Sequence, residues 1–205
     1  MPTLGEYSEV AICNLALAEL GRGAEITSLD EQSQPARACR RRYPYARDAV
    51  LRNYDWNFAA RRASLPASAA PPAFGYASAF DLPADCLFVR AMPDSACTTW
   101  EIEGNRLLTN ASPPVPINYT ARVTNPGAFD AMFVDALATR LAADLCVQLS
   151  ENTARAQSLL QLYQVKLDEA RRRDSQEGRA AHEERGSWLD ARFEPGFVLP
   201  PNGER

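Results

Sequence analysis

The strongest pattern in the sequence is a pair of long apolar stripes at helical spacing in its second half. The first stripe predicts a helix over residues 129–149, about 30 Å long at the usual rise per residue. The second predicts a helix from Thr153 to at least Arg173. Only a short junction separates them, so we expect an antiparallel pair. The stripe residues are Phe129, Met132, Phe133, Ala136, Leu137, Leu141, Leu145 and Leu149, then Leu159, Leu160, Leu162, Tyr163 and Leu167.

Two further helices are predicted in the first quarter of the chain. Ser8 is suited to cap the first helix and Gly21 to end it. The second helix is predicted to start near Ser33 and to end near Trp56. Pro44 lies inside its pattern and is expected to kink or break it, because proline lacks a backbone donor and clashes with the preceding turn.

The middle of the chain changes from helical patterns to strand patterns. Residues 64–79 are rich in alanine, proline and serine and predict a connector. The predicted strands cover residues 86–92, 98–103, 106–109 and 116–123, with a hairpin turn at 103–105. We therefore predict an α+β fold that is mainly helical, an antiparallel helix bundle with a small inserted antiparallel β-sheet module and an extended C-terminal tail.

These patterns divide the chain into four segments. Residues 1–63 and 125–185 supply the bundle helices, residues 64–124 the connector and β module, and residues 186–205 the tail. Prolines and glycines exclude a long helix in the tail, yet it carries large apolar residues that a disordered tail normally lacks. We expect it to dock on another surface, of its own subunit or a partner. The docking residues are Trp188, Leu189, Phe193 and Phe197.

Composition is that of a soluble globular protein, with 46% hydrophobic and 23% charged residues. No apolar run is long enough to cross a bilayer and the N-terminus lacks a signal-peptide pattern, so synthesis in the cytoplasm and no membrane partner are expected. Five cysteines occur at wide spacing without a C-x-x-C motif, and His182 is the single histidine. A zinc site needs about four close ligands, so we expect no metal and no cofactor.

Basic residues gather between Arg37 and Arg62. The whole chain has a formal net charge of −4, but this segment holds eight arginines and two aspartates, a local balance of +6. One interpretation is a nucleic-acid-binding module whose arginines contact phosphates. The other is ion pairing with neighbouring helices or subunits. Aromatic platforms for single strands need exposed rings, whereas Trp56 and Phe58 lie beside two alanines at a helix end, which favours their burial.

Motifs for enzymatic chemistry are scarce. The sequence has no nucleotide-binding glycine loop and no G-x-S-x-G elbow. Asp81 and Asp85, in F-D-L-P-A-D, are the best pair for a general acid and base, and they make a carboxylate-based cell-wall hydrolase a second alternative. Aspartates at a strand entry also bond nearby backbone amides, and we favour this structural role.

An ordered set of short motifs runs along the chain. The motifs are A-I-C-N-L-A-L-A-E-L-G with I-T-S-L-D-E, Y-A-R-D-A-V-L-R-N-Y-D-W-N-F-A, F-D-L-P-A-D-C-L, W-E-I-E-G-N-R-L-L-T-N, I-N-Y-T-A-R-V-T-N-P-G-A-F-D, L-A-A-D-L-C and A-R-R-R-D-S. In this order they resemble the head-to-tail adaptor family of short-tailed bacteriophages and prophages, of the tail tubular protein A type. W-N-F-A and L-P-A-D are the most telling elements. The match covers most of residues 6–178, and the tail after Gly186 has no counterpart.

The resemblance implies a structural virion protein without enzymatic turnover. Such proteins form a ring, expected to have twelve subunits, at the head–tail junction of the virion. The implied partners are other copies of the chain, the portal protein above the ring and the tail nozzle protein below it. Double-stranded DNA would pass through the channel without sequence-specific contact.

Candidate site residues fall into three groups under this reading. Besides the tail, the residues expected to contact a subunit or the portal are Arg171, Arg172 and Arg173. The candidate subunit or channel charges are Arg40, Arg41, Arg61 and Arg62. The expected structural anchors are Trp56, Phe58, Leu82 and Pro83. We expect the arginines of the basic segment to be largely paired, because a wall of strong phosphate binders would hinder passing DNA.

Overall fold

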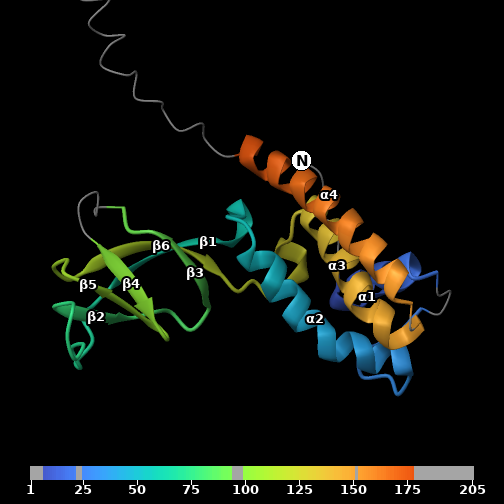
Figure 1. Ribbon diagram of the computed structural model, residues 1–205, viewed down its shortest axis with the longest axis horizontal. Helices are drawn as coiled ribbons and strands as arrows, with labels where there is room; N and C mark the ends of the chain where they lie inside the picture. The colour runs from blue at the N-terminus through green and yellow to red at the C-terminus, as the bar shows by residue number, and fades with distance from the viewer. Residues whose placement is uncertain (1–6, 22–24, 94–98, 151, 178–205) are drawn as a thin grey trace, which may run out of the picture.

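A computed structural model describes residues 7–21, 25–93, 99–150 and 152–177. Four helices gather in one body and six strands in another (Figure 1). The helices are α1 (Glu9–Glu19), α2 (Gln34–Arg52), α3 (Ala131–Ser150) and α4 (Thr153–Glu177), with short 3-10 turns at Asn57–Ala59 and Pro126–Ala128. The predicted α+β class, with an antiparallel β module inserted between helices, is confirmed.

α3 is the central helix of the bundle. It packs against α1, α2 and α4, and α4 returns beside it after a short junction, as predicted (Figure 1). On α4, Tyr163 and Leu167 are buried against this core, whereas Leu160 and Leu162 are 40% and 42% exposed. The predicted stripe on α4 was therefore too wide. The buried residues of α4 recur every three or four positions, and the two exposed leucines lie off that face.

The helix termini follow the expected capping chemistry. The side-chain oxygen of Ser8 accepts a hydrogen bond from the backbone N–H of Ala11 at 3.0 Å, and Ser33 caps α2 in the same way. Gly21, just after α1, has a φ of 69°, a conformation that favours glycine. α2 runs without interruption through Pro44, so the expected break does not occur. Pro44 is exposed. The backbone carbonyl in the preceding turn, which receives no hydrogen bond from proline, can therefore bind water.

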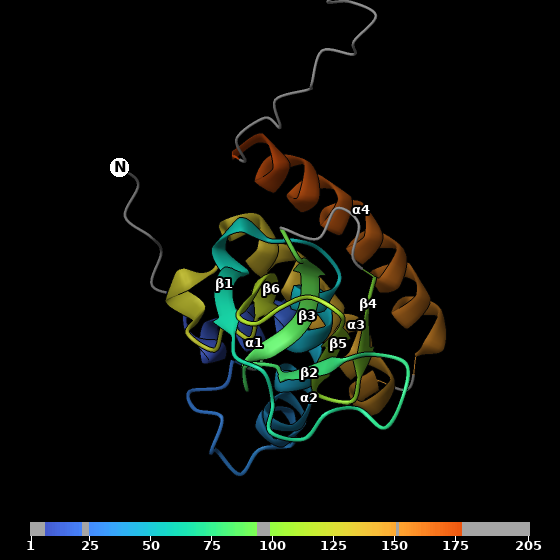
Figure 2. The ribbon, with the colours of Figure 1, turned by 90° about the vertical axis from the view of Figure 1, so that its left-hand side faces the viewer.

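The strands form two three-stranded antiparallel sheets, where one small sheet was predicted. Sheet A has the order β1 (Ala60–Leu65), β6 (Val115–Ala121) and β3 (Cys86–Ala91), and sheet B the order β2 (Ser78–Asp81), β5 (Arg106–Thr109) and β4 (Trp100–Glu103). The sheets share an apolar core in which Phe80 and Leu107 of sheet B meet Val89 and Ile117 of sheet A. Figure 2 looks onto this module with the helices behind it.

β1 and β2 are the strands that the sequence analysis missed. β1 begins at Ala60, within the segment assigned to the N-terminal helices, and β2 begins at Ser78, within the predicted connector. Their sequences, A-R-R-A-S-L and S-A-F-D, lack the alternation of large apolar residues that marks a strand. Each is held by pairing, β1 with β6 and β2 with β5. The predicted hairpin between β4 and β5 is confirmed, with Gly104 at a φ of 60°.

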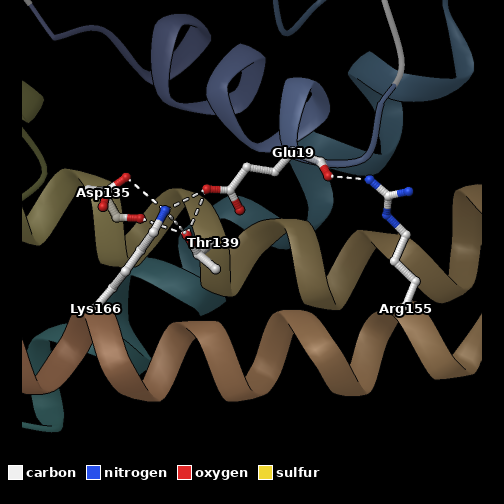
Figure 3. A network of polar contacts seen from close by, with 5 residues as sticks. All are labelled: Glu19, Asp135, Thr139, Arg155 and Lys166. Carbon is white, nitrogen blue, oxygen red and sulfur yellow. Dashed lines mark hydrogen bonds and ion pairs between the residues drawn. The ribbon is translucent and has the colours of Figure 1, made fainter.

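Lys166, the single lysine of the chain, ties three helices together (Figure 3). Its ammonium group donates to Glu19 Oε1 of α1 at 2.8 Å, and to Asp135 Oδ1 and Thr139 Oγ1 of α3 at 2.9 Å and 2.8 Å. Burial alone would lower the pKa of Lys166, but the hydrogen bonds to the two carboxylates raise it overall. Arg155 adds a second link from α4, donating to the backbone carbonyl of Glu19 at 2.8 Å.

Candidate functional site

The chain turns from α2 into the sheet module around Trp56, whose side chain is fully buried. Its indole N–H donates to the backbone carbonyl of Val50 at 3.0 Å. Its ring lies edge-on to Tyr54 and Phe133, with centroids 5.1 Å away in both cases. Phe58 is half-buried and joins the same cluster, 5.0 Å from Phe133. The predicted burial of Trp56 is confirmed, and the cluster links α2 and α3 to the start of β1.

Asp174, near the end of α4, holds the same junction from the other side. Its carboxylate accepts the backbone N–H of Asn57 at 3.0 Å, and its backbone carbonyl accepts the Asn57 side-chain N–H at 2.6 Å. Burial raises the pKa of Asp174, although the bond from Asn57 opposes the shift. Sequence reasoning missed Asp174, because one aspartate in a highly charged helix has the pattern of a solvated residue.

Arg90, on β3, connects the sheets to this junction and was also missed. Its guanidinium pairs with Asp55 at 3.0 Å and donates to Thr120 Oγ1 at 2.8 Å. It also donates to the backbone carbonyl of Trp56 at 3.2 Å. Burial is the largest effect on Arg90 and lowers its pKa. These contacts link sheet A to the turn around Trp56 through one largely buried cation.

An open groove lies beside Arg90, and we call it the junction groove. It is lined by Asp55, Ala60, Arg61, Arg62, Arg90, Ala91, Asn118 and Tyr119. Three of these residues are arginines, and the one aspartate is already paired with Arg90. The groove is therefore positively charged, and it brings together two arginines that the sequence singled out with one that it did not.

Arg61 and Arg62 lie side by side on β1, where successive side chains point to opposite faces of the sheet. Arg61 stands opposite Tyr119 and Arg62 opposite Asn118 on β6. The guanidinium of Arg61 turns back to donate to two backbone carbonyls, the nearer being that of Ala60 at 2.9 Å. Arg62 is exposed and has no hydrogen-bond or ion-pair partner among the described residues.

The remaining arginines of the basic segment are mostly engaged inside the subunit. The ion pairs are Arg40–Asp30 at 3.3 Å, Arg42–Asp144 at 3.2 Å and Arg47–Asp48 at 2.9 Å. Arg52 lies over the ring of Phe88 at 5.8 Å. Arg41 is exposed and has no such partner within the part of the chain that the structure describes. Ion pairing inside the subunit thus accounts for Arg40, Arg42 and Arg47, but not for Arg41, nor for Arg61 and Arg62 on β1.

The other predicted contact residues divide into engaged, exposed and undescribed groups. Arg171 donates to the side-chain oxygen of Asn53 at 2.8 Å and lies over the ring of Tyr54 at 5.7 Å, so it ties α4 to the end of α2. Arg172 and Arg173 are exposed on α4. Outside the described residues lie Trp188, Leu189, Phe193 and Phe197.

The L-P-A-D segment lies between β2 and β3. Leu82 is half-buried and packs against the core shared by the two sheets. Pro83 is half-buried as well, and its carbonyl accepts the backbone N–H of Cys86 at 2.9 Å, which closes a turn into β3. Leu82 thus contributes to the core of the sheets and Pro83 to the turn, and their anchoring role stays a prediction.

The two aspartates of this segment have separate partners. Asp81 pairs with Arg106 across sheet B at 3.1 Å. Asp85 accepts the hydroxyl of Tyr119 at 3.3 Å, and its backbone carbonyl accepts the N–H of Arg122 at 2.7 Å. Each aspartate thus has a side-chain partner within the sheets, where the favoured interpretation expected bonds to nearby backbone amides, and no observation singles out the pair for acid–base chemistry.

Within the described ranges, no cluster of three or more potential metal-ligating side chains occurs, and no helix has the length and apolarity needed to cross a membrane. A scan against protein-family models finds no match to this chain, and a search of curated proteins finds no significant relative.

Proposed function

We propose that the protein is a structural head-to-tail adaptor subunit, one copy of a ring that joins the portal of a short-tailed bacteriophage to its tail nozzle and continues the DNA channel. One observation carries the proposal. The two most telling motifs of the resemblance fall at the joints of the fold, W-N-F-A in the aromatic junction and L-P-A-D at the turn between the sheets. Motifs at the connections between helices and strands, and between the two sheets, are expected in a family whose members share a structural role.

Apolar side chains on the surface support a role in assembly. Phe74, in the loop between β1 and β2, is 87% exposed. On α4, Val165 is 65% exposed and lies close along the helix to the exposed Leu162. Single exposed apolar residues are common, but groups of them mark surfaces that contact a partner. An adaptor needs such surfaces toward the portal, the nozzle and its neighbours.

The junction gives the subunit the rigidity that this role needs. Trp56, Asp174 and Arg90 each connect the helices to the strands through buried or largely buried contacts. A ring that transmits position from the portal to the tail requires that the two bodies keep a fixed relative orientation. Side chains locked by packing and hydrogen bonds hold such an orientation better than a flexible connector does.

Electron microscopy of the purified protein mixed with the portal protein from the same genome tests the proposal. We expect a second ring stacked coaxially on the portal, with a central opening wide enough for duplex DNA. A mixture in which the portal keeps its bare outline, while the protein remains monomeric, would count against it.

The junction groove favours one alternative, a nucleic-acid-binding module. Arg61 and Arg62 lack carboxylate partners in the described structure and line one groove together with Tyr119. Such a module would bind short DNA as an isolated monomer, with an affinity that falls steeply as salt rises. An adaptor subunit should bind it weakly and without sequence preference. Titrating labelled DNA at two salt concentrations separates the two functions.

A further inference from the structure

Two edge strands of the sheet module lie on opposite sides, β1 of sheet A and β4 of sheet B (Figure 2). The other edge strands among the described residues are β3, which packs against α2, and β2, where the carbonyl of Ala79 accepts the backbone N–H of Ser68. Edge strands expose backbone N–H and C=O groups that can pair with another chain. A ring interface requires two different surfaces on one subunit, and these two edges meet that condition.

The β1 edge carries unbalanced positive charge. Arg61 and Arg62 are both exposed, and neither has a carboxylate partner among the described residues. The hydrogen bonds of Arg61 go only to backbone carbonyls, which leave its charge uncompensated. Asp55, the acid that shares the junction groove, is paired with Arg90 instead.

The β4 edge carries unbalanced negative charge. Glu101 and Glu103 are exposed, and no described residue forms an ion pair or hydrogen bond with either side chain. Arg106 stands opposite Glu103 on β5, but its guanidinium pairs with Asp81. Alternation along the strand places both glutamates on one face and the 41%-exposed Ile102 on the other.

We propose that the β1 edge of one subunit contacts the β4 edge of the next, which brings the basic edge with Arg61 and Arg62 against the acidic edge with Glu101 and Glu103. This inference rests on the proposed ring. A second copy of the chain fits better than nucleic acid, because one contact balances both charged edges, whereas a phosphate backbone would balance only the arginines. The contact is heterologous, so it repeats around a closed ring. Complementary charge would set the register and suppress wrong pairings.

Charge reversal tests the contact, with ring formation on the portal as the readout. Arg61→Glu with Arg62→Glu makes both edges negative, and Glu101→Arg with Glu103→Arg makes both edges positive. Alone, each variant should assemble about tenfold less than wild type, because like charges then meet at every contact. Mixed together, the two should assemble again in alternation, since each negative edge then meets a positive one. The variant that carries all four substitutions, with the charges of the two edges exchanged, should also form rings.

The controls separate this inference from the function on which it rests. Arg37→Glu reverses the charge of an exposed residue on α2 and should assemble like wild type. If both edge variants assemble normally, or if the mixture and the fourfold variant fail as the two edge variants do, the edge contact is wrong while the adaptor function stands. If Arg61→Glu with Arg62→Glu loses only DNA binding, the basic edge serves nucleic acid and the contact is also wrong. Absence of rings for the wild type rejects the function itself.

Discussion

The carboxylate of Asp174 accepts the backbone N–H of Asn57 at 3.0 Å, across a sequence separation of 117 residues. This bond joins the end of the last described helix to the first turn after Trp56. It satisfies a backbone donor at the junction with an acid that burial makes costly to ionise. The contact therefore contributes both to the geometry of the junction and to its response to pH.

Replacing Asp174 tests that response. Because its pKa is raised in the folded state, this group favours folding most in acid, and its contribution is lost as pH rises from about 4 through the folded pKa. Asp174→Asn keeps an acceptor and removes the charge, so it lacks the loss of stability that wild type undergoes as pH rises. The free energy of unfolding of this variant, relative to that of wild type, should therefore increase between pH 4 and pH 7. Urea unfolding at both pH values measures the difference.

Two further variants control for this effect. Asp174→Ala removes the acceptor and should cost about 1–3 kcal/mol, because the N–H of Asn57 loses its partner. Asp168→Asn changes an exposed acid on the same helix and should change little. Equal losses for the asparagine and alanine variants at position 174 would contradict the role of the acceptor. A difference between Asp174→Asn and wild type that stays the same at both pH values would contradict the role of the charge.

Trp56→Ala should destabilise the protein by about 3–5 kcal/mol, since it removes a fully buried ring from the aromatic cluster. Thermal unfolding followed by circular dichroism measures the loss of stability. The variant should lose folded protein first, and any loss of partner binding should follow from that unfolding. Tyr45→Ala, at a ring that is 73% exposed on α2, is the matched control, with an expected change within about 0.5 kcal/mol. Similar effects for the two variants would show that Trp56 does not anchor the junction.

Lys166→Met should cost about 1–3 kcal/mol at pH 7, because it leaves Glu19 and Asp135 without their shared cation. The raised pKa of Lys166 gives stability that is full below the unfolded pKa of about 10.4 and lost as pH rises through the folded value. The difference between wild type and variant in denaturant unfolding should therefore shrink above about pH 10.4. A difference that stays constant would argue for lost packing in place of lost charge contacts.

The helices were predictable from the sequence because their signals are local. Ser8 and Ser33 as caps, and the stripe of α3, depend on residues within a few turns of one another. β1 was not predictable, because A-R-R-A-S-L becomes a strand only through its partner β6, whose paired residues are 50 to 60 positions away. Burial of Trp56 followed from its neighbours, whereas Asp174 and Arg90 acquire their roles from contacts made across the fold.

Native mass spectrometry of the portal protein mixed with this chain tests the adaptor proposal most directly. The account predicts one new complex whose mass exceeds that of the portal by a whole ring of 22.6 kDa subunits, with twelve copies as the number that the resemblance implies. A portal mass that stays unchanged across a range of added protein, with the chain still monomeric, would contradict it.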